Sequence, residues 1–164
     1  MTPEQNYREY VAGNLERLRR IAFLLCGDWH TADDLTSTVL VKLFRHWRRA
    51  ARFENLDAYV RRMLMRAWLD ERRRPWRRET ATAALPEVAA GPGGDPARRV
   101  AVLSLLAALP PRRRAVLVLR YFCDLSVEET AEALGCSEGT VKSQAARALE
   151  SLRAHVSEGD ALWT

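Results

Sequence analysis

The sequence predicts an all-α chain built as two small helical domains joined by a flexible linker. Apolar residues recur at helical spacing through most of the 164 residues, and no segment shows convincing strand alternation. Glycine and proline gather between Thr80 and Pro96, where neither a helical nor a strand period appears. We therefore expect a first domain over 7–78, a flexible linker over 79–97 and a second domain over 98–157.

Two helices are expected at the start of the first domain. The first runs from Asn6 to Cys26, and the segment Gly27–His30 interrupts it. Thr31 can cap the second helix, which continues to about Ala50. Its inward stripe, widened by Leu40 and Phe44, consists of Leu35, Val39, Leu43 and Trp47.

A third, strongly basic helix follows the loop Arg52–Asp57. Asp57 can cap this helix, which extends from Ala58 to about Arg74. The residues expected to face inward are Val60, Leu64 and Trp68. Its arginines are Arg61, Arg62, Arg66, Arg72, Arg73 and Arg74. A basic face is usually only solvated, but guanidinium groups bind phosphates and the indoles of Trp68 and Trp76 can stack on bases. The segment therefore favours contact with nucleic acid.

The second domain is predicted to begin with two short helices. One runs from Arg98 to Leu109 and is stopped by Pro110-Pro111. The next runs from Arg112 to Cys123. The residues of this helix expected to face the core are Val116, Leu119 and either Tyr121 or Phe122.

The segment Leu125–Gln144 has the pattern of a helix-turn-helix. Ser126 and Glu129 can form a capping box, Gly135 suits a left-handed turn, and Ser137 can cap the second helix. The inward positions of the second helix are Val141, Ala145, Leu149 and Leu152. Its other faces carry Lys142, Ser143, Gln144, Ala146 and Arg147, several of which can donate hydrogen bonds to phosphates and base edges. The competing interpretation is an ordinary helical hairpin.

Composition further limits the classes of function that fit the chain. The formal net charge of +5 and the isoelectric point of about 9.6 are typical of a nucleic-acid binder. Three cysteines without a C-x-x-C pair argue against a disulfide framework or a zinc finger, and they fit a reducing cytoplasm. We expect no signal peptide and no membrane span. The histidines lack metal-ligand spacing, and no phosphate loop or nucleophile motif occurs, so we expect no metal, no cofactor and no enzyme activity.

The two halves together resemble bacterial extracytoplasmic-function sigma factors, in particular an actinobacterial sigma-E-like subgroup. The segment 32–47 is similar to the core-binding helix of sigma region 2, and 57–74 is similar to its promoter-melting helix. In the second half, 109–122 and Gly139–Ser143 are similar to sigma region 4. The resemblance covers nearly the whole chain.

This resemblance implies a dissociable specificity subunit. Its partners would be core RNA polymerase, through the beta-prime clamp helices and the beta flap, and promoter DNA. The implied core-binding residues are Asp33, Asp34, Leu35, Ser37, Thr38, Lys42 and Arg45. The implied −10 residues are Phe53, Glu54, Asn55, Arg61, Arg62, Arg66 and Trp68, and the implied −35 residues are Thr140, Lys142, Ser143, Gln144 and Arg147. An anti-sigma factor is left open as a further partner.

The chain departs from the family pattern at two places. Members commonly carry glutamine and then an acidic residue where this chain has Ser37 and Thr38, and many carry arginine where it has Gln144. The alternative function is a helix-turn-helix regulator that acts without the polymerase. The basic helix and the Asp33-Asp34 pair in the first half favour the sigma-factor interpretation. A third possibility, an RNA-binding helical adaptor, would lack the resemblance to both sigma regions.

Overall fold

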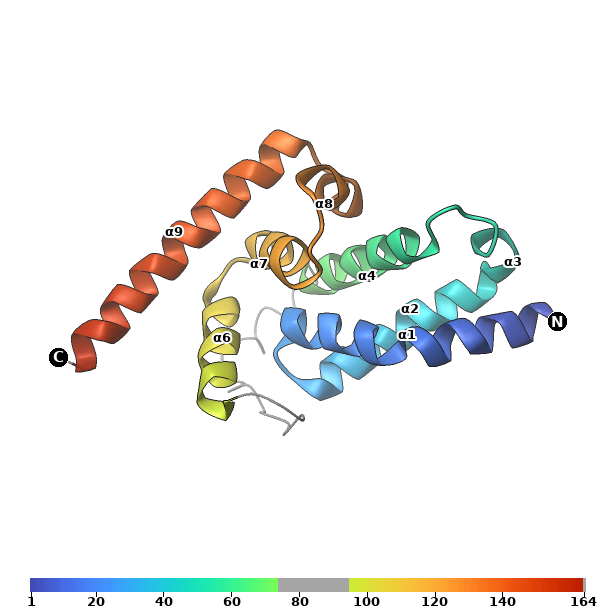
Figure 1. Cartoon of the computed structure of the whole chain (residues 1–164), viewed down its shortest axis with the longest axis horizontal. Helices are drawn as coiled ribbons and strands as arrows, with labels where there is room; N and C mark the ends of the chain where they lie inside the picture. The colour runs from blue at the N-terminus through green and yellow to red at the C-terminus, as the bar shows by residue number, and fades with distance from the viewer. Residues whose placement is uncertain (74–94, 164) are drawn as a thin grey trace.

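A computed structural model describes residues 1–73 and 95–163, with side chains described up to residue 157 (Figure 1). Its elements are α1 Pro3–Cys26, α2 Trp29–Arg45, α3 Trp47–Ala50, α4 Leu56–Arg73, α6 Pro96–Ala108, α7 Pro111–Leu117, the π-helical turn η1 Val118–Phe122, α8 Val127–Leu134 and α9 Glu138–Trp163. Within these residues the fold is helical without strands, which confirms the predicted all-α class. The predicted linker over 79–97 lies outside the described residues up to residue 94.

Helix α1 begins three residues earlier than expected, because its cap lies upstream of the apolar pattern. The Thr2 hydroxyl accepts a hydrogen bond from the Gln5 amide at 3.2 Å, and the Gln5 side chain accepts one from the Thr2 amide at 2.9 Å. This capping box satisfies two backbone donors at the helix start. Gly27, with φ +82°, ends the helix in the left-handed conformation that suits glycine.

Two predicted caps in the first half are wrong. Asp28, and not Thr31, caps α2, since its carboxylate accepts from the Thr31 amide at 2.8 Å. Asn55, and not Asp57, caps α4, since its side-chain oxygen accepts from the Ala58 amide at 3.0 Å. Helix α2 also ends at Arg45, before the separate turn of α3. In each case a second capping residue was available a few positions upstream.

The predicted inward stripes of the first half are confirmed except at Phe44, which is 51% exposed. Leu35, Val39, Leu43 and Trp47 are buried, and so are Val60, Leu64 and Trp68. Tyr7 adds a long-range contact from α1 to α2, because its hydroxyl donates to the Leu40 carbonyl at 2.8 Å. Its ring also meets the edge of Trp47, with 5.5 Å between the centroids. Helices α1, α2 and α4 therefore enclose one core.

The second half begins at Pro96, where Asp95 caps α6. The last two positions assigned to the linker thus belong to a helix. The prediction that either Tyr121 or Phe122 faces the core is wrong, because these side chains are 56% and 51% exposed. The π-helical turn explains the difference: it has more residues per turn than an α-helix and therefore shifts the angular position of its last residues. Val116 and Leu119 are buried as predicted, and Val118 is buried as well.

The helix-turn-helix is confirmed in its local details. Ser126 and Glu129 form the capping box at the start of α8. Gly135 ends that helix with φ +65°, and the Ser137 hydroxyl accepts from the Thr140 amide at 3.1 Å. Val141 of α9 is fully buried, as predicted. Ala148 is also fully buried, although the expected stripe did not include it. The predicted positions Ala145, Leu149 and Leu152 are only half-buried.

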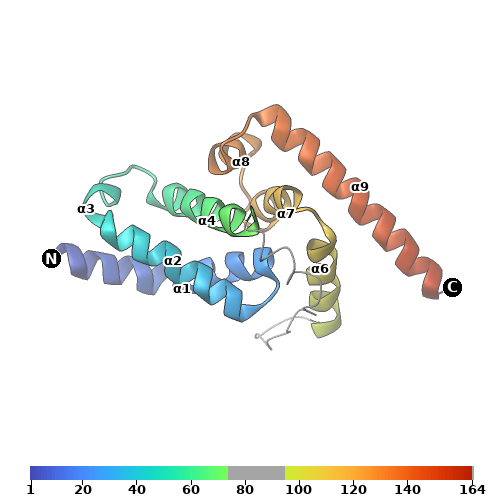
Figure 2. The ribbon, with the colours of Figure 1, turned by 180° about the vertical axis from the view of Figure 1, so that it is seen from behind.

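The two halves share a hydrophobic core that the sequence did not reveal. Leu106 and Leu117 of the second half belong to the same buried cluster as Leu18 and Leu64 of the first. Helix α4 packs against α8, and α1 packs against α6 and η1. Figure 1 and the reverse view in Figure 2 both show α7 and α8 beside the end of the α1–α2–α4 bundle, with α9 on the outside.

Candidate nucleic-acid interface

The first half of α9 presents the predicted −35 residues on an ordered surface. Lys142, Ser143 and Arg147 are exposed, while Thr140 and Gln144 are half-buried. The Thr140 hydroxyl shares a hydrogen bond of 2.9 Å with the Ser137 hydroxyl, so it takes part in the helix cap. Buried Val141 and Ala148 anchor the opposite face of α9. The helix therefore holds polar side chains outward from a fixed backbone, as a DNA-reading helix requires.

Two neighbours decide how the reading face is arranged. The Arg113 Nε group of α7 donates a hydrogen bond to the Gln144 side-chain oxygen at 3.3 Å. In contrast, no ion pair joins Arg147 to Glu150 among the side chains described, although the spacing of the two residues would allow one. Arg147 is therefore available to a ligand, whereas Gln144 is already held by a neighbouring helix.

The loop before α4 carries the first of the predicted −10 residues. Glu54 and Asn55 are exposed, and Phe53 is half-buried with its ring against the Tyr59 edge at 4.9 Å between centroids. The end of the loop is tied to α1 through Asp57. The Asp57 carboxylate accepts from the Tyr10 hydroxyl at 2.9 Å and pairs with Arg17 at 3.1 Å. Sequence reasoning missed these contacts of Asp57, because Tyr10 and Arg17 lie at least 40 positions away in a different helix.

The basic residues of α4 divide into two groups. Arg62 and Arg66 are exposed. Arg61 is half-buried, and its Nε atom is buried without a hydrogen-bond partner. Together with Arg17 and Arg20, Arg61 lines a hollow of about 350 Å³ whose other walls include Phe122 and Cys123 of the second half.

The assignment of Trp68 to base stacking is corrected by the structure. Its side chain is 2% exposed, and the Arg114 guanidinium lies over its ring, 5.6 Å from the centroid. Trp68 follows Val60 and Leu64 at intervals of four, so the periodicity that predicts an inward position also removes the ring from any base. Trp76 lies outside the described residues.

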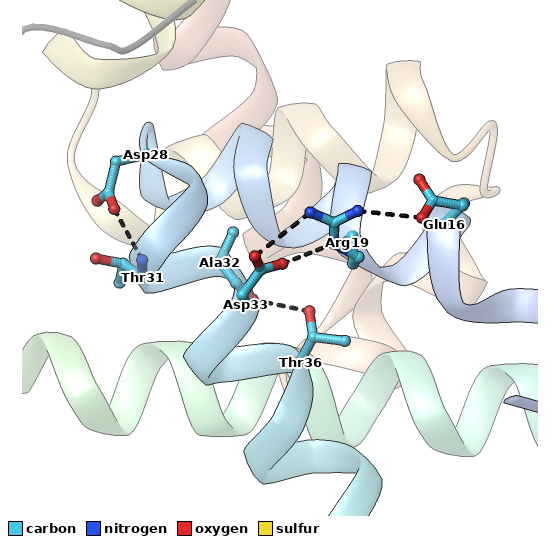
Figure 3. Close-up of polar contacts among 7 residues, drawn as sticks. All are labelled: Glu16, Arg19, Asp28, Thr31, Ala32, Asp33 and Thr36. Atoms are coloured by element: carbon cyan, nitrogen blue, oxygen red, sulfur yellow. Dashed lines mark hydrogen bonds and ion pairs between the residues drawn. The ribbon is translucent and has the colours of Figure 1, made fainter. Parts of the chain in front are cut away.

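The acidic pair on α2 is divided between two environments (Figure 3). Arg19 of α1 binds both Asp33 oxygens, at 2.6 and 3.4 Å, and also contacts Glu16 at 3.1 Å. These hydrogen bonds raise the pKa of Arg19, the one to Asp33 most of all. Asp34 is exposed, and among the described side chains only His30 lies within ion-pair distance, at 3.7 Å. Asp33 is therefore engaged within its own domain, whereas Asp34 faces solvent.

The remaining predicted core-binding residues form a mixed surface, with one exception. Ser37, Thr38, Lys42 and Arg45 are exposed. Leu35 is 5% exposed and belongs to the core, so its assignment to the surface is corrected. Two apolar side chains on this helix are exposed: Val41 at 52%, which sequence reasoning missed, and Phe44 at 51%, whose predicted place in the inward stripe is wrong. Val41 lies three residues after Thr38, on the outer face of the helix. The sequence could have indicated its exposure, because Val41 is an apolar residue outside the inward stripe.

No group of three or more histidine, cysteine, aspartate or glutamate residues in 1–73 and 95–157 could hold a metal ion. In the same part of the chain, every helix is too short or too polar to cross a membrane.

Known proteins match both halves of the chain. Residues 10–78 match the model of Sigma-70 region 2, and residues 99–152 match that of Sigma-70, region 4. The RNA polymerase sigma-E factors of Streptomyces avermitilis and Streptomyces coelicolor are both 36% identical to the chain. The first alignment covers 94% of this chain and 87% of the relative, and the second covers 90% and 84%.

A solved structure shares the fold. It is the sigma factor RpoE in complex with the anti-sigma factor NepR from Bartonella quintana, which is 23% identical to this chain. The two folds superpose with a TM-score of 0.76 over 93% of this chain and 98% of the other. The region 2 match contains α2 and α4, and the region 4 match contains the first half of α9. The sigma-E relatives align over both regions. The chain therefore belongs to the sigma-70 family, as an extracytoplasmic-function RNA polymerase sigma factor of the sigma-E-like type that directs promoter-specific transcription initiation.

Proposed function

We propose that this sigma factor reads a −35 element through the first half of α9 and a −10 element through the loop at 53–55 and α4. The observation that carries the proposal is the polar face of α9, held outward by a helix whose opposite side is anchored at Val141 and Ala148. In a helix-turn-helix, residues in this half of the second helix reach base edges in the major groove.

At the −35 element we assign separate roles by side-chain chemistry. Arg147 and Gln144 discriminate bases, because each can make hydrogen bonds to base edges. Lys142 and Thr140 contact phosphates, and Ser143 supports this contact with its exposed hydroxyl. The unpaired guanidinium of Arg147 supports its assignment to DNA.

At the −10 element the loop and the helix have different tasks. Phe53, Glu54 and Asn55 form the part that captures an unstacked base, while Arg62 and Arg66 hold the phosphates of the separated strand. Arg61 joins them when the hollow it lines is open to DNA. Base contacts and phosphate contacts offset the unstacking cost of a few kcal/mol.

The outer face of α2 is the surface we assign to core RNA polymerase, on the beta-prime clamp helices. It combines Asp34, Ser37, Thr38, Lys42 and Arg45 with the exposed side chains of Val41 and Phe44. An apolar centre with a polar surround is typical of protein–protein contacts. The second half would contact the beta flap.

Further features of the proposal follow from the family. The protein acts in the cytoplasm without catalysing a covalent reaction of its own. An anti-sigma factor is a candidate partner, since the Bartonella quintana relative was solved in complex with one.

Run-off transcription with purified core polymerase tests the proposal. The chain should co-elute with core polymerase and direct initiation from promoters selected from genomic DNA. The regulator interpretation would be favoured if the chain bound promoters tightly by itself and left core polymerase unaffected.

A further inference from the structure

The contact between Arg113 and Gln144 constrains how the reading helix meets DNA. Arg113 lies in the first turn of α7, the helix that packs along α9, and Gln144 lies in the second turn of α9. The Arg113 Nε group donates to the Gln144 side-chain oxygen at 3.3 Å, and both side chains are half-buried. The contact therefore joins a scaffold helix to a residue proposed to read a base.

The chemistry of the pair fixes which way round the Gln144 amide lies. A guanidinium has five donors and no acceptor, whereas a carboxamide has one oxygen acceptor and one NH₂ group with two donors. Only the amide oxygen of Gln144 can hydrogen-bond to Arg113. The NH₂ group of Gln144 then remains free to donate to another partner, while one of the two lone pairs of the oxygen is occupied by Arg113.

This orientation determines which bases Gln144 can accept. In the major groove, guanine presents N7 and O6 as acceptors, thymine presents O4, and adenine presents N7. Cytosine presents only its N4 amino group, which is a donor. An amide whose oxygen already accepts from Arg113 keeps both NH₂ donors free but only one acceptor lone pair, so it favours a base that presents an acceptor over cytosine, which presents only a donor.

We propose that Arg113 is a positioning residue for base reading, which holds the Gln144 oxygen, leaves the amide donors free for DNA and so disfavours cytosine as the base that Gln144 contacts. This inference rests on the proposed function and deepens it. A glutamine free to turn could meet cytosine with its oxygen, so removal of Arg113 should relax the preference at that position alone.

The test uses holoenzyme assembled from core polymerase and the full chain, bound to promoter duplexes randomised at the −35 element. In Arg113→Met, cytosine should rise about tenfold at one position, a change expected for one base contact. Gln144→Ala should lose the preference at the same position, and Arg113→Met should add nothing there in the Gln144→Ala background. Gln144→Glu keeps an acceptor for Arg113 but removes the donors, so it should favour cytosine.

Arg112→Met is the matched control, because Arg112 is the exposed neighbour in the same turn and carries the same charge. It should leave base preference unchanged. The inference is overturned if Arg113→Met weakens all sequences alike, if its effect persists in Gln144→Ala, or if Gln144→Ala alters no base position. Loss of all −35 selection by the unaltered chain would instead contradict the proposed function. Thermal unfolding of each variant establishes that it is folded, and Gln144→Glu supplies an independent outcome if Arg113→Met is not.

Discussion

The Arg114 guanidinium lies 2.7 Å from the Leu25 carbonyl oxygen, although the two residues are 89 positions apart. The same group donates to the Ala107 and Leu109 carbonyls, at 3.0 and 3.1 Å. Burial, together with the nearby charge of Arg72, lowers the pKa of Arg114 to about 10. The Leu25 carbonyl belongs to the last turn of α1, where the helix dipole favours a positive charge. Arg114 thus connects the two halves at a buried position.

Replacing Arg114 by methionine should destabilise the protein. Three carbonyl oxygens would lose a charged donor, which costs about 2–4 kcal/mol in the free energy of unfolding. Urea denaturation measures this change. The exposed neighbour gives the control, since Arg112→Met should stay within about 0.5 kcal/mol of the unaltered chain. Equal losses in both variants would contradict a specific role for Arg114.

Tyr10 should make stability depend on pH in the alkaline range. Burial raises its pKa above the usual value of 10.0, and the hydrogen bond to Asp57 raises it further. Above about pH 10 the unfolded chain loses the tyrosine proton while the folded chain keeps it, so the free energy of unfolding should fall as pH rises. Below that pH the contribution is fully present.

Tyr10→Phe tests this prediction directly. The variant should lose about 1 kcal/mol at neutral pH, the usual worth of one hydrogen bond. It should also show a smaller decline in stability between about pH 10 and 11. Urea denaturation of both proteins across this range decides the matter. Parallel pH profiles would show that Tyr10 does not titrate differently in the folded protein.

The two aspartates of α2 should respond differently to charge reversal. Asp34→Arg should weaken binding to core polymerase and change the free energy of unfolding by less than about 0.5 kcal/mol, because the residue is exposed. Asp33→Arg should also cost about 1 kcal/mol of stability, since it breaks the ion pair with Arg19 and places the new guanidinium next to that of Arg19. Core-binding titrations and urea denaturation, run on both variants, separate the effects. Unchanged core binding in Asp34→Arg would remove this residue from the proposed surface.

Arg147 should determine preference at one −35 base pair. Arg147→Ala is expected to cost roughly 1–3 kcal/mol at the preferred sequence and to relax selection at that position. Lys142→Ala is the comparison, because loss of a phosphate contact weakens all sequences alike and reduces the salt slope by about one. Transcription from a library randomised at the −35 element measures both. Unchanged selection in Arg147→Ala would refute its role in base reading.

Local patterns predicted most of the elements correctly. The capping box of Ser126 and Glu129, the turn at Gly135 and the inward position of Leu64 each depend on residues a few positions apart, and all are confirmed. The prediction that Trp68 stacks on a base was wrong. It rested on the arginines around this residue and not on the helical periodicity. The spacing of Trp68 from Leu64 already indicated burial.

Non-local contacts could not be read from the sequence. The partners of Asp33 and Asp57 come from α1, so nothing in the neighbouring residues shows that these carboxylates are engaged. The exposure of Phe122 depends on a π-helical turn, which has no distinct residue pattern. Arg114 is one of three consecutive arginines, Arg112-Arg113-Arg114. Only the packing of α7 shows which of the three is buried.

The packing of α8 on α4 has a consequence for apparent affinity. A ligand that needs the covered side of α4 binds only the fraction of molecules in which the two halves are apart, and its apparent dissociation constant is the intrinsic value divided by that fraction. An opening free energy of about 2.7 kcal/mol would leave roughly 1% of molecules competent and weaken binding about 100-fold. For a promoter contact on the covered side of α4, mutations far from DNA that loosen this packing would therefore tighten binding while they leave every base contact unchanged.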